Sequence, residues 1–411
     1  MRTGNKSILP IISLALLAAA ESHPQRRSAA TSLTDQYDIS FNLDTKSSMT
    51  NICDYRLTTK RKRRLGGKGL ERRTEHGGPE PITVKLDRIG KTDLWTGDVA
   101  LDRDPMSVGN PKFAVVFDTA LGDFRLMTSI SKGSVKDLKL YKPPADKQQQ
   151  AGHHFKGDYA TPEYTGAAFE DTIHISGAQV AGVHIVGLTQ VDATRRIGAD
   201  GSLGMSFDTN PAVAKLHFFT QFSLQYRDHP KIFAFYFGHH AELHLGGIKK
   251  SAYLGEIEYH NVVPVKNELL FWTIKTGVIL VDHLGHELTM MRTFFNTGSQ
   301  VVHGPYNQVK LFYDKIGGFE REHQGRKYFM FDCKAVRPVI SFKWGSRVWL
   351  YDDFGKIESG GICIGGIQAK TYEFDPEIWS IGTRWMKRKC LIFNKQEQKV
   401  GIAIANLSHG Q

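Results

Sequence analysis

Several patterns are missing from this chain, and each absence narrows its class. There is no Gly-x-Ser-x-Gly, P-loop or dinucleotide-binding pattern, so the enzymes that depend on these motifs gain no support. Beyond residue 20, no stretch approaches 18 consecutive apolar residues, and we therefore expect no membrane span. The pairs His153–His154 and His239–His240 have no partner at ligand spacing, so we interpret them as loop histidines and expect no metal and no cofactor.

Cysteine is scarce as well. The 411 residues contain four, Cys53, Cys333, Cys363 and Cys390, and sequence alone leaves three pairings of the four open. In an oxidising compartment Cys333 and Cys363 could close a loop of about 30 residues, which the chain-entropy model values at roughly 3–4 kcal/mol. Cys390 falls on a predicted strand, and we interpret it as a buried thiol rather than a nucleophile.

The N-terminus has the pattern of a secretory signal. Arg2 and Lys6 precede the apolar run Ile8–Leu17, and Ala18–Ala20 supplies small residues for cleavage. A signal anchor is the competing interpretation, but the run is short for a span. We therefore predict a signal peptide over residues 1–20 and a protein that is secreted or enters the endolysosomal lumen.

The net charge of +11 is concentrated in one segment. Residues 56–73 hold nine Lys or Arg against one Glu. This segment could bind nucleic acid or another polyanion, but in a secretory protein a multibasic, glycine-flanked run is more simply a processing site, and we expect no nucleic-acid partner. We predict a basic propeptide or linker over residues 21–73. Asn406 begins a weakly specific N-glycosylation sequon that is consistent with secretion.

Beyond residue 80 the pattern is one of short strands, and it predicts a mostly β fold with a few short helices. The clearest helical stretch is Tyr306–Ile316, which Gly317–Gly318 ends. The strand-like runs are Ile82–Leu86, Trp95–Leu101, Ile173–Leu188, Ile232–Phe237, Glu242–Leu245, Leu269–Val281, Val339–Trp344 and Leu391–Ile404.

Two of the apolar segments end in similar polar turns. The segment FAVVFDTALGDFRL carries Asp118-Thr119-Ala120, and TFFNTGSQVV carries Asn296-Thr297-Gly298, 178 positions later. Such a separation is about one lobe of a two-lobed protein. If each turn brought a carboxylate to a shared cleft, the pair could perform acid–base chemistry, but the second turn has an amide.

With these two turns, the chain from residue 80 to 406 resembles the pepsin-like aspartic peptidases. FAVVFDTALGDF is similar to the first active-site strand and turn of that family. Phe155–Thr172 resembles its flap hairpin, with Tyr159 at the flap tyrosine, and Asp200–Gly204 resembles its DG-h-LG loop. Phe271–Ile274 resembles the strand that opens its second lobe. Its closing pattern is matched by Trp379–Gly382 with Phe393 and Val400–Ala403. Their order along the chain makes the resemblance specific.

The resemblance implies a bilobal fold with an interlobe cleft that binds a peptide or protein, in a monomer. We expect an N-terminal lobe over residues 74–262 and a C-terminal lobe over residues 263–411. The resemblance also implies a disulfide between Cys333 and Cys363. It places Asp118 and Asn296 at the catalytic positions, and it puts Tyr159, Thr119, Ala120, Thr297, Gly298 and Ser299 at substrate-binding positions.

The chemistry of that family needs two carboxyl groups about 3 Å apart that share one proton, for which aspartic proteases are the standard example. Asp118 matches the first, whereas Asn296 cannot exchange protons and is interpreted as preserving the hydrogen bonds of its turn. Losing one acid or base group costs about 10²–10⁴ in rate, and Asp118 should titrate as a single group. Further departures from the family pattern are Ala120, Leu121 and Arg125 near the first turn, and Ala160 and Pro162 in the flap.

Three hypotheses follow. The first is a secreted pseudopeptidase that binds a peptide or protein in the cleft. The second is an aspartic endopeptidase with residual acid activity, which needs a substitute proton carrier near Asp118. The third places function on the outer surface, with a dispensable cleft.

Overall fold

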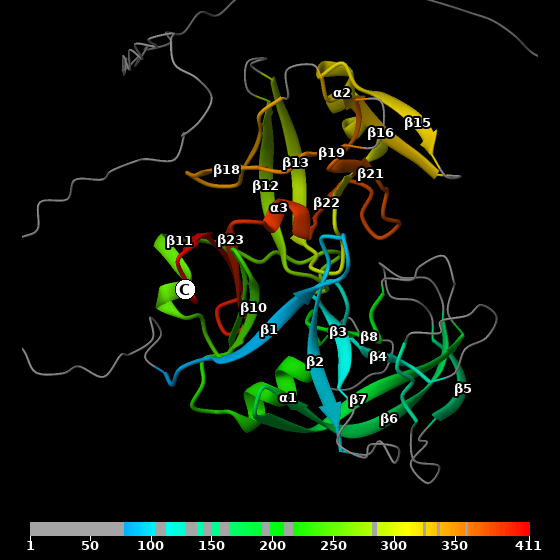
Figure 1. Cartoon of the computed structure of the whole chain (residues 1–411), viewed down its shortest axis with the longest axis vertical. Coiled ribbons are helices and arrows are strands. Elements are labelled where there is room, and N and C mark those ends of the chain that lie inside the picture. Colours follow the sequence, from blue (N-terminus) through cyan, green and yellow to red (C-terminus); the bar gives the residue numbers. More distant parts are fainter. Residues whose placement is uncertain are drawn as a thin grey trace, which may run out of the picture. The chain divides into compact units, whose positions relative to one another are not determined.

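The structure is a computed structural model of the chain (Figure 1). It describes residues 78–102, 112–128, 138–142, 150–155, 164–190, 198–208, 217–281, 286–323, 326–334, 338–357 and 361–411. The predicted signal peptide, the basic segment and the flap residues Tyr159, Ala160 and Pro162 lie outside these ranges. Within them the chain is mostly β with a few short helices, as predicted. No helix in these ranges is both long and apolar enough to cross a membrane.

The largest sheet has 13 strands and contains strands from both halves of the chain. Strand β23 near the C-terminus pairs with β9, so residues on both sides of the predicted lobe boundary share one sheet. In spatial order its strands are β11 (Tyr253–Asn261), β24 (Lys399–Ala405), β23 (Lys389–Asn394), β9 (Ile232–Phe237), β10 (Ala241–Leu245), β1 (Ile82–Arg88), β2 (Trp95–Leu101), β3 (Phe113–Asp118), β8 (Gly201–Gly204), β4 (Phe124–Met127), β7 (Ala178–Gln190), β6 (Tyr164–Ile175) and β5 (Gln150–Phe155).

Two smaller sheets are built from the C-terminal part of the chain. The order of the seven-stranded sheet is β18 (Val348–Leu350), β17 (Ile340–Lys343), β12 (Thr273–Val281), β13 (His286–Phe295), β22 (Ile378–Ile381), β14 (Val302–Gly304) and β21 (Ile367–Ala369). The order of the four-stranded sheet is β15 (Phe319–His323), β16 (Arg326–Asp332), β20 (Ile362–Gly365) and β19 (Gly355–Ile357). The disulfide between Cys333 and Cys363 ties the end of β16 to β20, with Cα atoms 5.4 Å apart, and confirms the predicted pairing.

The predicted helix is present as α2 (Tyr306–Lys315), which buries Val309, Phe312 and Tyr313. Its end coincides with Gly317, whose φ of 69° is the left-handed conformation that glycine adopts after a helix. Within the described residues, the other helical elements are α1 (Phe218–Gln225), α3 (Thr383–Met386) and the 3-10 turn η3 (Lys250–Ala252).

Two of the predicted strand runs prove to be hairpins rather than single strands. Ile173–Leu188 is split between β6 and β7 by a turn at Ser176 and Gly177, both of which have positive φ. Leu391–Ile404 is likewise divided between β23 and β24. In each case the sequence marks the turn, with Ser176-Gly177 in the first run and the polar residues 394–399 in the second.

Asp93 connects the N-terminal strands to α3. Its carboxylate lies 2.7 Å from Lys387 Nζ and 3.1 Å from Arg384 Nε, and its backbone N–H donates to Gln300 Oε1 at 3.1 Å. Burial alone would raise the pKa of Asp93, but the hydrogen bonds and positive charges of Lys387 and Arg384 hold it below its usual range. These ion pairs therefore fasten α3 to the segment between β1 and β2.

Candidate active site

The two polar turns lie against each other and exchange hydrogen bonds. The Thr119 N–H donates to Thr297 Oγ1 and the Thr297 N–H donates to Thr119 Oγ1, both at 3.0 Å. Each hydroxyl then donates across the interface, Thr119 to Phe295 O at 2.7 Å and Thr297 to Phe117 O at 2.5 Å. Both threonines are buried. The ends of β3 and β13 are thus locked together through groups that solvent cannot replace.

Each turn also holds its own leading side chain in the same way. The Ala120 N–H donates to Asp118 Oδ1 at 2.8 Å, and the Gly298 N–H donates to Asn296 Oδ1 at 2.9 Å. Asn296 is buried, and its backbone N–H donates to Ile381 O at 2.8 Å. The amide therefore makes the turn hydrogen bond that the carboxylate makes in the first turn, as predicted.

The carboxylate of Asp118 packs directly on the backbone of the second turn. A Cβ atom added to Gly298 would lie 2.1 Å from Asp118 Oδ2 and 2.4 Å from its Cγ. Only glycine allows so close an approach. At the matching position of the first turn, the Ala120 methyl is buried in an apolar cluster with Phe271, Phe294 and Tyr372.

A third segment closes the loop behind the first turn. Strand β8 runs parallel to β3 with Gly204 opposite Asp118, and the Met205 N–H donates to Asp118 O at 2.8 Å. The Asp200 carboxylate accepts from Ala114 N–H and Lys139 N–H, each at 2.8 Å. The segment Asp200–Gly204, identified from the sequence as a loop-closing motif, therefore supports the first turn.

The remaining sequence-predicted residues have varied surroundings. Leu121 is buried, and Arg125 forms a buried ion pair with Asp123 at 3.1 Å, so the arginine that replaces an apolar family residue is accommodated by a carboxylate. The half-buried Ser299 donates from Oγ to Val301 O at 3.3 Å. The Asn406 side chain donates from Nδ2 to Ser251 O at 2.8 Å.

Tyr372 is a residue near this site that sequence reasoning missed. Burial raises the pKa of Tyr372 to about 12, and the negative charge of Asp118 adds to this effect. The phenol therefore stays protonated over the whole range in which proteins are stable. No periodicity or spacing in the sequence marks Tyr372, because it reaches the first turn only through the fold.

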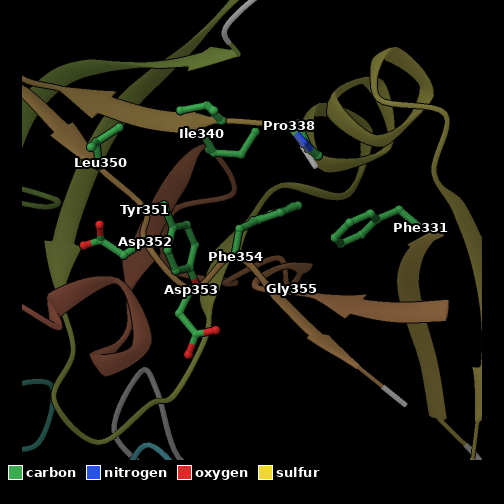
Figure 2. Close-up of a pocket in the computed structure, with 10 residues that line it drawn as sticks. Phe331, Pro338, Ile340, Leu350, Tyr351, Asp352, Asp353, Phe354 and Gly355 are labelled. Atoms are coloured by element: carbon green, nitrogen blue, oxygen red, sulfur yellow. The ribbon is translucent and has the colours of Figure 1, made fainter. Parts of the chain in front are cut away.

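A separate pocket of about 250 Å³ lies in the C-terminal part of the chain (Figure 2). Tyr351, Asp352, Asp353 and Phe354 line it, and neither Asp118 nor Asn296 does. The pair Asp352–Asp353, predicted to be a turn rather than an ion site, does form a turn, and lysines lie beside both carboxylates: Lys389 Nζ at 3.7 Å and Lys387 Nζ at 2.7 Å. These cations leave little reason for the acidic pair to bind another ion.

The comparisons with known proteins agree with the geometry. The family model described as eukaryotic aspartyl protease matches residues 104–405. The chain is 26% identical over 332 residues to an aspartic protease of Phaffia rhodozyma, covering 76% of this chain and 77% of that protein. It is 26% identical over 333 residues to secreted aspartyl protease 1 of Malassezia globosa (78% and 75% covered) and 24% identical over 339 residues to cathepsin D of Bos taurus (73% and 83%).

The match spans more than half of the chain and includes both polar turns. The predicted bilobal pepsin-like fold is thereby confirmed. With strands ending in two interlocked Thr-centred turns, and with a family match across both, the chain belongs to the eukaryotic aspartyl protease family.

Proposed function

We propose that this protein is a pseudopeptidase, which binds a peptide or protein in the cleft between its lobes without cleaving it. The observation that carries the proposal is Asn296, held by the Gly298 N–H where the second carboxylate of the family would stand. We propose the N-terminal lobe over residues 74–262 and the C-terminal lobe over residues 263–411. Thr119, Ala120, Thr297, Gly298 and Ser299 would form the floor of the cleft, and Tyr159 would lie above it.

The chemical reason is the missing proton. Peptide hydrolysis by this family needs one carboxylate to take a proton from water while the other acid polarises the peptide carbonyl. Asp118 can serve as one member. The Asn296 amide can accept and donate hydrogen bonds but cannot pass a proton, so the cycle stops after substrate binding.

Residual acid proteolysis is the alternative, and one observation favours it. Burial and, to a lesser extent, the negative charge of Asp118 raise the pKa of Tyr372 to about 12, so its hydroxyl stays protonated. A neutral phenol could donate a hydrogen bond to a developing oxyanion, although its pKa is poorly matched to proton transfer in acid.

We also propose the setting in which the protein acts. A signal peptide over residues 1–20 and a basic propeptide over residues 21–73 would direct it to the secretory pathway, as a monomer without a nucleic-acid partner. The relatives include a secreted aspartyl protease and cathepsin D, which supports this route. Glycosylation at Asn406 would fit the same compartment.

The test compares cleavage and binding in the same samples. Purified protein lacking residues 1–73 is incubated with a peptide library between pH 3 and pH 7, and binding of a transition-state-analogue inhibitor is measured by calorimetry. The variants are Asn296→Asp, Asp118→Ala and the double variant. We expect the wild type to bind the analogue and cleave nothing. Asn296→Asp alone should gain less than the about 10²–10⁴-fold that one acid group supplies, because the flap substitutions Ala160 and Pro162 remain.

Two results would decide against the proposal. Cleavage by the wild type that Asp118→Ala abolishes would establish the residual peptidase, and its loss in Tyr372→Phe would identify the proton donor. The second result has two parts: the wild type does not bind the analogue, and it binds a partner whose affinity is unchanged by substitutions in the cleft. This outcome would indicate that the functional surface lies outside the cleft.

A further inference from the structure

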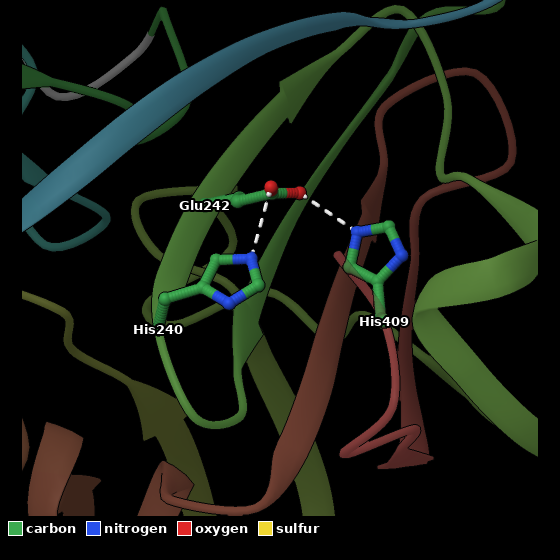
Figure 3. Close-up of side chains that lie close together, drawn as sticks. All are labelled: His240, Glu242 and His409. Atoms are coloured by element: carbon green, nitrogen blue, oxygen red, sulfur yellow. Dashed lines mark hydrogen bonds and ion pairs between the residues drawn. The ribbon is translucent and has the colours of Figure 1, made fainter. Parts of the chain in front are cut away.

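A cluster of imidazoles surrounds one carboxylate away from the two turns, on strand β10 (Figure 3). His240 Nε2 lies 3.1 Å from Glu242 Oε1, and His409 Nε2 lies 3.0 Å from Glu242 Oε2. His244 Nε2 lies 2.7 Å from the same Oε2 atom. Figure 3 shows the rings of His240 and His409 on either side of the carboxylate, each with a nitrogen turned toward it.

The strand explains how three of these residues come together. Glu242 and His244 are alternate residues of β10 and so point to the same face, and His240 directly precedes the first residue of that strand. The sequence therefore contains a recognisable His-x-Glu-x-His pattern at residues 240–244. The prediction from the sequence considered only the adjacent pair His239–His240 and so did not use this pattern. His409 comes from the C-terminal turn, 167 positions after Glu242, so only the fold could add it.

The C-terminal turn is anchored where it delivers His409. The Tyr236 hydroxyl donates to Asn406 O at 3.0 Å, and the His409 N–H donates to Asn406 O at 3.0 Å. A Cβ atom added to Gly410 would lie 2.8 Å from His240 Cε1, so the turn packs closely on that ring. The histidine is thus placed by several contacts beyond its own bond to Glu242.

The donor set is that of a transition-metal site. Two imidazole nitrogens and one carboxylate oxygen form the His₂Glu combination that holds zinc with a fourth position open. The side chains of Glu242 and His409 are 14% and 7% exposed, whereas that of His240 is 36% exposed. An ion could therefore enter beside His240 and be held by two groups that are largely shielded from water.

The distances require little rearrangement. One ligand atom from each of His240, Glu242 and His409 lies within 4.8 Å of the others. Zinc bonds of 2.0–2.2 Å in a tetrahedron place ligand atoms about 3.4 Å apart, so shifts of about an ångström would close the site. Each imidazole would offer the Nε2 lone pair to the ion, and its proton would move to Nδ1.

His244 has a different position in this cluster. It is fully buried, and its Nδ1 accepts from the Lys249 N–H at 3.5 Å, which leaves its Nε2–H to donate to Glu242. A ligating carboxylate that accepts such a bond is fixed in orientation. His244 is therefore a positioning residue for Glu242 rather than a ligand.

We propose that His240, Glu242 and His409 bind a divalent transition-metal ion of the zinc type, with water or an outside ligand in the fourth position. The sequence-based expectation of no metal missed this site because His409 is remote in the chain. Binding would fasten the C-terminal turn to β10. The proposal does not depend on whether the cleft cleaves peptides.

The test titrates zinc chloride into chelator-treated protein and measures binding by calorimetry. We expect about one zinc ion per chain, and His240→Gln and His409→Gln should each weaken its binding by more than the about 10–100-fold that loss of an outer-shell partner costs. His239→Gln is the matched control, because His239 is the exposed neighbour of His240 and has no place in the cluster. This variant should bind zinc like the wild type.

Two further measurements keep the test independent of folding. Circular dichroism and thermal unfolding in chelator establish that each variant is folded, and zinc should raise the unfolding temperature of the wild type and of His239→Gln but not of His409→Gln. His244→Gln should keep the stoichiometry and weaken binding by about 10–100-fold. The proposal is overturned if the wild type binds no zinc, or if His240→Gln and His409→Gln bind it as tightly as His239→Gln.

Discussion

The two turns of the site have the same hydrogen bonds but different chemistry. In each, a backbone N–H two residues on donates to the leading side chain, at 2.8 Å for Asp118 and 2.9 Å for Asn296. Because a carboxylate and an amide carbonyl are equivalent as acceptors, the backbone cannot tell them apart. The shared geometry of the two turns therefore carries no information about catalysis. Catalysis depends instead on the other side-chain atom of residue 296, which is the amide nitrogen Nδ2 because Oδ1 accepts the turn bond.

The turns differ in a second respect, which is space. Gly298 leaves room for the Asp118 carboxylate, whereas Ala120 fills the corresponding position with a buried methyl. By the symmetry of the two turns we expect that methyl to face Asn296. One turn thus accommodates a charged group and the other packs an apolar one, and the substitutions below test each difference.

The largest effect is expected at the shared threonines. Thr297→Val removes the acceptor of the Thr119 N–H and the donor to Phe117 O, and Thr119→Val removes their counterparts. Because these groups are buried, each substitution should lower the free energy of unfolding by about 2–4 kcal/mol. Urea denaturation at pH 6 measures this change. If the turns are equivalent in structure, the two variants should lose similar amounts.

Serine supplies the control, since Thr119→Ser and Thr297→Ser keep the hydroxyl and lose one methyl. These variants should lose about 1 kcal/mol, the value of one buried methyl group. A loss in one valine variant that is several times the loss in the other would show that the turns are not equivalent, and the comparison would fail at its first step.

An intermediate effect is expected from exchanging the small residues. Gly298→Ala would bring its methyl to within 2.1 Å of Asp118 Oδ2, and overpacking of this kind costs about 1–3 kcal/mol. The carboxylate must also move, so binding of the transition-state analogue should be lost. Ala120→Gly removes a packed methyl, which should lower stability by about 1 kcal/mol and leave analogue binding intact.

Calorimetry of analogue binding, together with urea denaturation, distinguishes these expectations. If Ala120→Gly abolished binding while Gly298→Ala preserved it, the spatial difference between the turns would be the reverse of what the contacts indicate.

Much of this site could be predicted because its signals are local. The two turns, the Asp200–Gly204 segment and the helix at Tyr306 each occupy a few consecutive residues, and the bonds that hold Asp118 and Asn296 come from backbone N–H groups two residues on. Asn296 was readable as an isosteric acceptor for the same reason. The disulfide between Cys333 and Cys363 followed from the family resemblance and is present.

The parts that could not be predicted depend on contacts between remote segments. Tyr372 lies near Asp118, and His409 lies near Glu242, because the fold brings together segments that are far apart in the chain. The hairpin at Ser176 is a different case, because buried and exposed residues alternate on both sides of its turn and Ser176-Gly177 marks the turn locally. Local periodicity reports burial, whereas the partner that does the burying is a property of the whole fold.

The smallest expected effect is a change of stability with pH, and it concerns His217, which lies behind the first turn but not behind the second. His217 Nδ1 lies 3.4 Å from Ser206 O, and the Ser206 N–H donates to Leu121 O at 3.0 Å. Burial lowers the pKa of His217, although the negative charges of Asp208 and Asp123 oppose this. As the pH falls below about 6.5, the unfolded chain binds a proton that the folded chain refuses. Stability should therefore decrease in acid, by at most about 1.4 kcal/mol per pH unit for this one group.

His217→Gln should reduce that dependence, and the exposed His239→Gln should not. The buried His303, whose pKa is lowered to about 3 by burial, contributes a dependence of the same sign that both variants keep. Urea denaturation between pH 4.5 and pH 7 measures the slope, and amide hydrogen exchange locates it. In the wild type, acid should reduce protection at Leu121 and Ser206 before it reduces protection at Asn296, whose N–H is bonded to Ile381 O. Equal loss at both turns would mean that the titrating group acts on the whole molecule, and the difference between the turns would then be confined to Asn296 and Ala120.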